Sequence, residues 1–230
     1  MAHVGKTETE CSLPGRNITN HFALASLVLL ALCTSGVSQL TRPVQSDADT
    51  LVNDLRKLPT PLPVSPRSDG TISPAEQQRR RLYESLLRLG PSGALALSRA
   101  LGDDDVHLRR NAALALNVLG GGWYDAAWAK LDIRPALPKL VAALEDTDSN
   151  VRGWSAQAIG EIGPDAEKAV PDLITLLSNS DEGTRNSACI ALRFIGPGAK
   201  EALPALRKSL SDQSKDVRRF AALAIESIER

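Results

Sequence analysis

The sequence predicts an all-α protein, a right-handed α-solenoid of stacked helix pairs with an N-terminal cap helix. One reason is a short pattern that returns at a constant interval and is marked by three prolines: Pro138, Pro171 and Pro204. A second marker keeps the same step, because an arginine follows each proline at one fixed distance: Arg152, Arg185 and Arg218. Aromatic residues make up only 3% of the chain while Ala and Leu are abundant, which favours closely packed helices over β-sheets. A unit of this length buries its apolar face only when a neighbouring copy covers it, so we expect the copies to stack.

Composition limits the class of protein and its partners. With 230 residues and 43% hydrophobic content, the chain is long enough for a short solenoid and is not disordered throughout. Lys plus Arg and Asp plus Glu balance at 27 each, so no overall field attracts nucleic acid or an anionic membrane. We therefore expect no nucleic-acid partner.

Residues 1–38 are expected to be a signal peptide. An apolar run, 22–32, lies in a stretch without charged side chains, as in the apolar region of such a peptide. The run is shorter than the about 17 to 25 residues that a membrane-spanning helix needs. Cleavage after Ser38 would export the protein to the periplasm or the extracellular space, with no membrane insertion of the mature domain. Cys33 ends the apolar run and leaves open a lipoprotein, and an uncleaved segment would be an N-terminal membrane anchor.

Residues 39–73 are expected to be a Pro-rich linker with one short helix over 47–58. Four closely spaced prolines exclude a helix interior after that helix: Pro59, Pro61, Pro63 and Pro66. The linker is either a spacer or a Pro-rich ligand for a partner domain, and we favour the spacer.

A cap helix is predicted over residues 74–89. Ser73 can cap its first turn, Pro74 suits the first helical position, and Glu76 completes a capping box. The helix ends before a Gly-Pro pair, as two later helices do. It is expected to be the second helix of a unit whose first helix is missing, with the polar outer face that a terminal unit needs.

Four repeats follow, at about residues 92–120, 134–163, 167–196 and 200–230. In each, a leucine ends the first helix at a constant distance before the arginine: Leu101, Leu144, Leu177 and Leu210. The turns between carry Asp and Ser, which cap helices, and apolar residues recur at helical spacing on both sides. Each repeat is therefore an antiparallel helix pair. Cys189 stands where the flanking copies have alanine, which favours a small buried residue over a reactive thiol.

Three local motifs carry a resemblance to a known family. They are Ala-Val-Pro-Asp-Leu-Ile-Thr-Leu-Leu at 169–177, the turn from Asp148 to Arg152, and the Ile-Gly-Pro exits at 162–164 and 195–197. The chain resembles the HEAT-like repeat proteins of the phycobilisome lyase (PBS lyase) type over about residues 74–230. The resemblance implies a solenoid of HEAT-like helix pairs.

The resemblance also implies a ladder of Asp and Arg side chains near the turns between helices. The ladder would contain Arg109, Arg152, Arg185 and Arg218, with acids four positions before three of them: Asp105, Asp148 and Asp181. Such a ladder either binds an anion or holds the register between units through neutralised pairs. Because arginine suits partly buried bidentate pairing, we expect a mainly structural ladder.

No catalytic constellation is recognisable in the sequence. HEAT-like hydroxylases bind iron through His-Glu pairs, but the chain has only His3, His21 and His107, and export would leave His107 alone. No Ser-His-Asp set, phosphate-binding loop or zinc spacing occurs. We expect no enzymatic activity, no metal and no cofactor.

These features together predict an exported, non-catalytic scaffold for protein–protein interaction. Its partner would be an unidentified protein, and the chain itself a monomer or a weak oligomer. The alternative is an enzyme subunit, either similar to a bilin or cofactor lyase or similar to a chaperone.

The period fails once, at an aromatic insert over residues 121–132. The step from Gly120 to Pro138 is more than twice the equivalent step from Gly163 to Pro171. The insert carries three aromatic residues: Trp123, Tyr124 and Trp128. Insertions in repeat proteins map to loops on one face, and Trp and Tyr are enriched at binding hot spots. The rings either plug the gap between units or bind a partner; our hypothesis is that the first two contact a partner and the third anchors the insert.

Overall fold

The computed structural model describes residues 47–59, 73–121 and 130–230, and all of them belong to one compact unit, Val44–Arg230. The expected signal peptide and the three aromatic residues Trp123, Tyr124 and Trp128 lie outside the described residues. Within the described part, all regular structure is helical, so the predicted all-α class is confirmed. After a helix over residues 47–55, the α-helices are α2 (Pro74–Leu89), α3 (Pro91–Ala100), α4 (Val106–Gly121), α5 (Leu137–Ala142), α6 (Ser149–Ile162), α7 (Val170–Leu176), α8 (Glu182–Ile195), α9 (Leu203–Ser209) and α10 (Lys215–Glu229).

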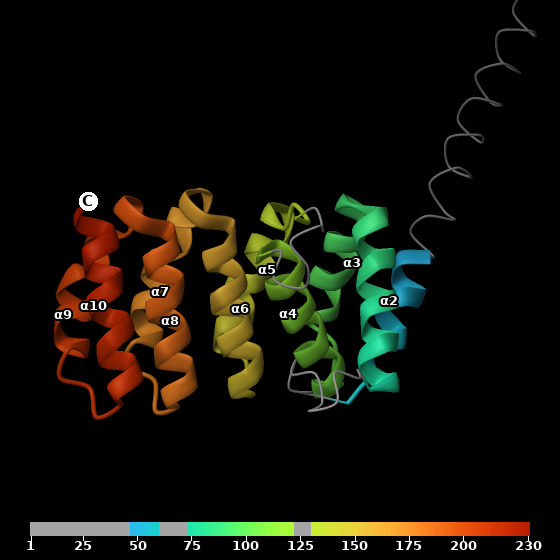
Figure 1. Ribbon diagram of the computed structural model, residues 1–230, viewed down its shortest axis with the longest axis horizontal. Coiled ribbons are helices and arrows are strands. Elements are labelled where there is room, and N and C mark those ends of the chain that lie inside the picture. The colour runs from blue at the N-terminus through green and yellow to red at the C-terminus, as the bar shows by residue number, and fades with distance from the viewer. Residues whose placement is uncertain (1–46, 60–72, 122–129) are drawn as a thin grey trace, which may run out of the picture. The chain divides into compact units, whose positions relative to one another are not determined.

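The helices form an α-solenoid of stacked pairs (Figure 1). Four units follow one another, each with a first and a second helix: α3 with α4, α5 with α6, α7 with α8, and α9 with α10. The second helices contact one another far more extensively than the first helices do. The second helices therefore form a continuous layer, and the first helices form a looser layer beside it.

Local sequence sets where the second helices begin and end. Side chains of Ser73, Asp148, Asp181 and Ser214 accept hydrogen bonds from backbone N–H groups in the first turns of α2, α6, α8 and α10. Three helices, α2, α6 and α8, end at a glycine with positive φ that is followed by a proline: Gly90, Gly163 and Gly196. The sequence pattern thus fixes both ends of these three helices.

The first helices α5, α7 and α9 are short and begin with 3₁₀ turns. These turns are η1 (Arg134–Ala136), η3 (Gly163–Ala169) and η4 (Gly196–Ala202), which lead into α5, α7 and α9, and η2 (Ala143–Glu145) extends α5. The repeated proline lies in the first turn of each of these helices, where its missing N–H would have no helical partner.

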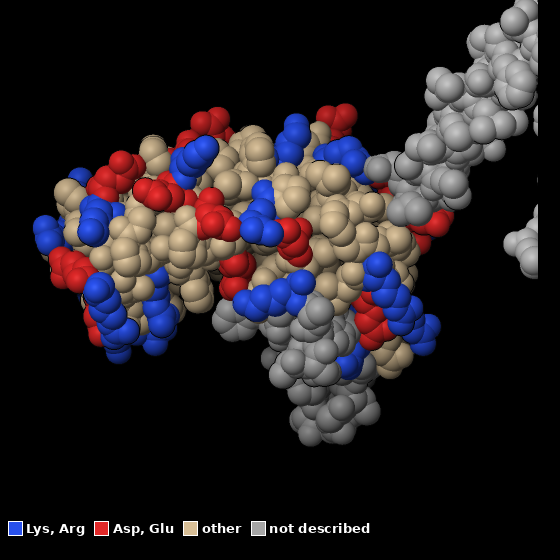
Figure 2. Space-filling view, turned by 90° about the horizontal axis from the view of Figure 1, so that it is seen from above, with Lys and Arg blue, Asp and Glu red and all other residues tan. Residues whose placement is uncertain are grey.

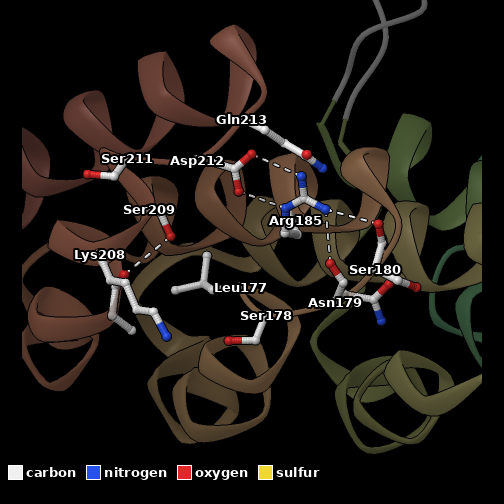
Figure 3. A pocket seen from close by; sticks show the side chains of 11 residues that line it. Leu177, Ser178, Asn179, Ser180, Arg185, Lys208, Ser209, Ser211, Asp212 and Gln213 are labelled. Carbon is white, nitrogen blue, oxygen red and sulfur yellow. Dashed lines mark hydrogen bonds and ion pairs between the residues drawn. The ribbon is translucent and has the colours of Figure 1, made fainter.

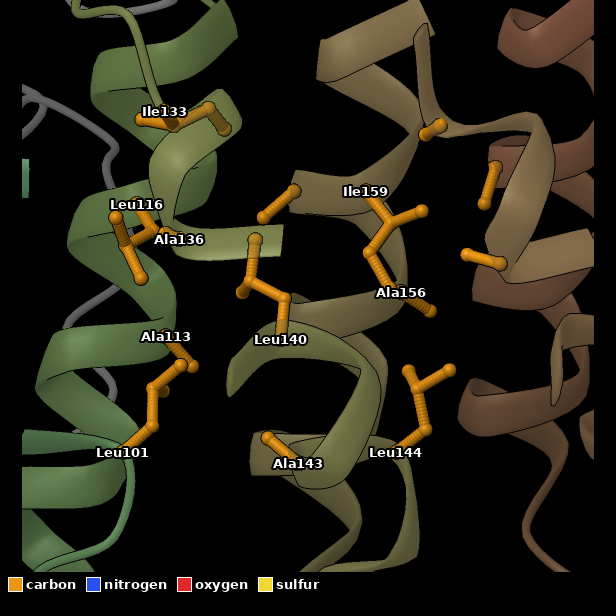
Figure 4. Close-up of a cluster of buried hydrophobic side chains, with 14 of the residues drawn as sticks. Leu101, Ala113, Leu116, Ile133, Ala136, Leu140, Ala143, Leu144, Ala156 and Ile159 are labelled. Atoms are coloured by element: carbon orange, nitrogen blue, oxygen red, sulfur yellow. The ribbon is translucent and has the colours of Figure 1, made fainter. Parts of the chain in front are cut away.

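The core is built from residues that recur in every unit. Leu140, Leu173 and Leu206 of the first helices are all 0% exposed. Figure 4 shows this core where the first and second units meet: Leu116 and Ala113 of α4 lie on one side of Leu140, and Ile159 of α6 lies on its other side. Each buried leucine of this kind contributes about 2 to 3 kcal/mol relative to an exposed one, so stacking supplies most of the stability of each unit.

The N-terminal unit differs from its prediction, because its first helix is present. The helix over residues 47–55 buries Val52, Leu55 and the following Leu58. Asn111 of α4 donates to the carbonyl oxygens of Leu55 and Leu58 at 2.9 and 3.1 Å and so caps the end of this segment. Residues 47–59, expected to be part of a linker, instead pair with α2 to form a capping unit in front of the first repeat.

The described end of the aromatic insert is packed against α4. The N–H of Leu131 donates to the carbonyl oxygen of Leu119 at 2.9 Å, and Leu131 and Ile133 are 5% and 3% exposed. A side chain at Gly120 would collide with Ile133. The extra chain therefore returns close to the end of α4 before α5 begins. Among the helices of the described residues, none is both long and apolar enough to cross a membrane.

Candidate binding surface

The repeated arginines clamp the turn between the two helices of their own unit. Each donates through Nη1 to two consecutive backbone carbonyl oxygens of that turn, at distances between 2.7 and 3.1 Å. The four residues are Arg109, Arg152, Arg185 and Arg218. These bonds satisfy carbonyl groups that no helix would satisfy, so the arginines fix the shape of the turns.

Two of the arginines also reach the next unit. Arg109 donates through Nε and Nη2 to both carboxylate oxygens of Asp146, at 2.7 and 3.2 Å. Arg185 makes the same pair of bonds to Asp212, at 2.8 and 2.9 Å. The hydrogen bond from Arg185 is the main reason that the pKa of Asp212 is lowered. Such bidentate pairs fix the register between neighbouring units.

At the remaining junction, between the second and third units, the acid is replaced by Asn179. Its Oδ1 accepts from the N–H of Asp181 at 2.9 Å, as Asp146 and Asp212 accept in their own turns. The amide nitrogen then stands where those turns have a second carboxylate oxygen. Nε of Arg152 is buried and has no hydrogen-bond partner among the described residues. Among the three junctions that join the four units, the one at Arg152 is therefore not closed by a carboxylate of the next turn.

The acids expected in the ladder, Asp105, Asp148 and Asp181, have another role. Each accepts from backbone N–H groups at the start of a second helix. The acids that pair with the arginines lie six positions before the arginine of their own unit, not four. This spacing was readable in the sequence, since Asp103, Asp146 and Asp212 keep it. Asp148 does bind an arginine, Arg110 of the preceding unit, and this bond is the main reason that its pKa is lowered.

A fifth arginine of the same series lies in the capping unit. Arg79 precedes Gly90 by the same step that separates Arg152 from Gly163. It is 1% exposed and donates to the carbonyl oxygen of Pro59 at 2.7 Å, just beyond the first helix of its unit. Asp103 of the first unit pairs instead with Arg56, at 2.9 Å.

A hollow of about 590 Å³ lies beside the ladder at the junction of the third and fourth units. Figure 3 shows Arg185 held between the carboxylate of Asp212 and the carbonyl groups of the preceding turn. Its donors are already engaged, so this guanidinium offers little to an added anion. Seen from above, acidic and basic side chains are intermixed over the visible face, and neither sign forms a large patch (Figure 2). The geometry supports a structural ladder more than an anion-binding stripe.

The layer of second helices offers a different surface. We call the solvent-facing sides of α4, α6, α8 and α10 the second-helix face. Partly or largely exposed aromatic side chains lie on three of these helices: Trp154, Phe194 and Phe220. Phe194 is 40% exposed, and the guanidinium of Arg219 lies 4.6 Å from the ring centre of Phe220. Trp and Arg are the residue types that dominate protein interfaces.

A second hollow, of about 290 Å³, opens on this face between α6 and α8. Its walls include the indole of Trp154 and three side-chain amides: Asn150, Gln157 and Asn186. Two glycines, Gly153 and Gly183, form part of its lining. The sequence pattern does not identify these residues as a site, because the repeat marks the positions that are constant between units rather than those that vary.

The other residues considered from the sequence are placed as follows. Cys189 is 0% exposed, and burial raises its pKa to about 12, so the thiol is not poised to react. His107 is exposed at the start of α4, where its N–H donates to Asp105 at 2.9 Å. Within the described ranges, no group of three or more His, Cys, Asp or Glu side chains is arranged to hold a metal ion.

Comparisons with known proteins agree with this architecture. A model of HEAT repeats matches residues 136–226. A search of curated proteins found no match. Among solved structures, an engineered protein of the Northeast Structural Genomics Consortium is similar with 23% identity and a TM-score of 0.53, over 80% of this chain and 96% of that chain.

Two further structures come from named repeat proteins. A designed armadillo repeat protein in complex with the peptide (KR)4 has 22% identity and a TM-score of 0.51, over 66% of this chain and 68% of that chain. The complex of CpcE and CpcF of phycocyanin lyase from Nostoc sp. PCC7120 has 25% identity and a TM-score of 0.50, over 73% of this chain and 70% of that chain. The chain thus folds as a HEAT-like α-solenoid, with HEAT repeats recognised over residues 136–226.

Proposed function

We propose that the protein is a non-catalytic scaffold that binds a partner protein on its second-helix face. The observation that carries this proposal is the continuous layer of second helices with aromatic side chains at its surface: Trp154, Phe194 and Phe220. Stacked repeats create an extended surface that no single unit has, and proteins of this architecture use it to bind partners. One of the solved structures of similar fold holds a peptide, which is compatible with the proposal.

A matched pair of substitutions tests this function. Phe194 on α8 and Leu95 on α3 are 40% and 42% exposed, but one lies in the layer of second helices and the other in the layer of first helices. We expect Phe194→Ala to weaken capture of the native partner at least tenfold, whereas Leu95→Ala leaves it unchanged. Affinity capture from the native host, with bound proteins quantified by mass spectrometry, measures both. Equal losses in the two variants, or a loss only in Leu95→Ala, would contradict binding on the second-helix face.

A lyase-like enzyme subunit is the second candidate. It is favoured by the similarity to the CpcE and CpcF complex, which is the structure of a phycocyanin lyase. Visible absorbance of protein purified from its native host separates the two candidates. A chromophore that stays bound through purification would support the lyase-like function and count against a scaffold without cofactor.

Export is a separate part of the proposal and is supported by the apolar run 22–32. Intact-mass measurement of the native protein tests it. A mass that lacks residues 1–38 is expected, and a mass that includes them would exclude cleavage after Ser38.

A further inference from the structure

We propose that the hollow between α6 and α8 binds the main chain of an extended peptide segment of the partner. This inference rests on the proposed function, because it assigns one part of the second-helix face to one kind of ligand. The hollow has a volume of about 290 Å³, lies between the second and third units and is lined by residues of both second helices.

Two glycines open the hollow. Gly153 of α6 stands at the position occupied by Arg110, Asn186 and Arg219 in the other units. Gly183 of α8 stands at the position occupied by His107, Asn150 and Asp216. In the other units, both positions therefore carry larger polar side chains. At the junction of the second and third units, both are glycine. Glycine in a helix interior, as at Gly153, is less favourable than alanine, so its lack of a side chain needs a reason such as space for another molecule or close helix packing.

Close packing accounts for part of this loss but not for all of it. A Cβ atom at Gly153 would lie 3.2 Å from Oγ of Ser187, so α6 and α8 approach each other closely there. At Gly183 the nearest atom to an added Cβ is Oδ2 of Asp181, at 3.3 Å, in the same helix cap. No other helix among the described residues crowds Gly183, so the lack of a side chain there leaves the hollow open.

A chain of hydrogen bonds holds one wall in place. Asn117 of α4 donates to Oε1 of Gln157 at 3.1 Å, and Nε2 of Gln157 donates to Oγ of Ser187 at 3.0 Å. The chain crosses three second helices and fixes the orientation of the Gln157 amide. A recognition group held in this way loses little entropy when a ligand binds.

Two other amides retain unused hydrogen-bonding capacity. Oδ1 of Asn186 is buried and has no partner among the described residues. The side chain of Asn150 makes no hydrogen bond that involves the described part of the chain. A buried polar atom without a partner is unfavourable, and a ligand that lets the Asn186 amide reorient and pair would offset part of this cost.

The chemistry of the lining selects a neutral ligand that both donates and accepts. None of the described residues that line the hollow is a Lys or Arg, which disfavours phosphate or carboxylate groups. Its one acidic side chain, Asp181, already accepts from the N–H and Oγ1 of Thr184, both at 2.7 Å. Peptide groups offer one donor and one acceptor per residue without charge, and the indole of Trp154 supplies an apolar wall for an adjacent side chain.

Selection from a random library of short linear peptides, with the full chain as target, supplies the probe. The best peptide is then resynthesised with single esters in place of successive peptide bonds, each of which removes one N–H donor. We expect one or two of these esters to weaken binding about tenfold, measured by fluorescence anisotropy. The same esters should have little effect on binding to Asn186→Ala, because the acceptor for that N–H is already absent.

Filling the hollow gives a second test. Gly183→Asn introduces the residue that the preceding unit carries at this position, and we expect it to weaken peptide binding at least tenfold. Gly102→Asn, in the exposed turn after α3, is the matched control and should bind normally. Both variants should melt within a few degrees of the wild type, and circular dichroism checks this.

Three outcomes would overturn the inference. Peptides that bind Gly183→Asn and Asn186→Ala as tightly as wild type, but bind Phe194→Ala weakly, would leave the proposed function intact and remove the hollow from it. Failure to select any peptide, while capture of the native partner still depends on Phe194, would do the same. A shift of the Trp154 indole signal in NMR spectra with maltohexaose, but not with peptides, would identify a sugar site instead.

Discussion

The junction between the third and fourth units and the junction between the second and third units are built differently. At the former, Arg185 makes a bidentate pair with Asp212, and both side chains are largely buried. At the latter, Asn179 stands at the position equivalent to Asp212, Nε of Arg152 has no partner among the described residues, and a hollow opens on the second-helix face. The junction of the third and fourth units is closed by a charge pair, and the junction of the second and third units is held by helix packing and by the hydrogen bond from Gln157 to Ser187.

The difference indicates that the junctions along the solenoid have different roles. Packing at the junction of the second and third units is close, since a Cβ atom at Gly160 would lie 2.9 Å from the backbone of Ala191. Apolar contact therefore holds α6 and α8 together without a bidentate charge pair. Charge pairs at the flanking junctions keep the register there, so the surface of the middle junction can differ without loss of register. A junction between repeats can therefore lack the arginine–carboxylate pair when the neighbouring junctions keep it.

The largest expected effect is the loss of Arg185. Arg185→Ala removes the partner of Asp212 and leaves the carbonyl oxygens of Asn179 and Ser180 without donors. We expect the free energy of unfolding to fall by about 3 kcal/mol. Arg152→Ala should cost about half as much, because it removes only the bonds to the turn of its own unit. Urea unfolding followed by circular dichroism measures both, and equal losses would show that the two junctions do not differ.

A smaller effect is expected when the acid at the junction of the third and fourth units is replaced by the amide found at the junction of the second and third units. Asp212→Asn should lower the free energy of unfolding by about 2 kcal/mol at pH 7. The pKa of Asp212 is lowered in the folded protein, chiefly by the hydrogen bond from Arg185. An unfolded Asp has a pKa of about 3.9, so this stabilisation is complete above that pH and is lost as the pH falls through the lower folded pKa. The gap between wild type and variant should close in that acidic range; a constant gap down to about pH 2 would argue against the charge pair.

The opposite conversion should be stabilising. Asn179→Asp supplies the carboxylate that the junction of the second and third units lacks. One of its oxygens would accept from the N–H of Asp181 and the other from Arg152. The turn at Asp146 and Asp148 already tolerates two acids at these positions. We expect a gain of about 1 kcal/mol at pH 7, measured by urea unfolding. The gain should be absent in the Arg152→Ala background, and its persistence there would mean that the new acid acts on something else.

Much of the scaffold could be predicted from the sequence, because stacking imposes the same residues on every unit. Fixed steps between Pro138, Pro171 and Pro204 located the first helices, and Ser73 with Glu76 located the start of α2. A short helix over 47–58 was predicted, but its place in the capping unit was missed because a longer connection separates it from α2. The step from Arg79 to Gly90, equal to that from Arg152 to Gly163, shows that this unit belongs to the same series.

The candidate site was harder to predict because it depends on differences between units. Asn179 and Gly183 depart from the repeat pattern, and their effect appears only when α6 and α8 lie side by side. The pairing of Arg109 with Asp146 joins residues 37 positions apart in neighbouring units, which local spacing cannot reveal. The aromatic residues Trp123, Tyr124 and Trp128 lie outside the described residues, so their predicted role in binding stays a prediction.

Amide hydrogen exchange of the full chain, with and without a selected peptide, tests the central claim most directly. The claim is that the partner binds the second-helix face at the junction of the second and third units. We expect bound peptide to slow exchange most in residues 149–157 of α6 and 183–187 of α8, with little change in α3, α7 and α9. Slower exchange confined to the first helices, or to the junction closed by Arg185 and Asp212, would contradict it.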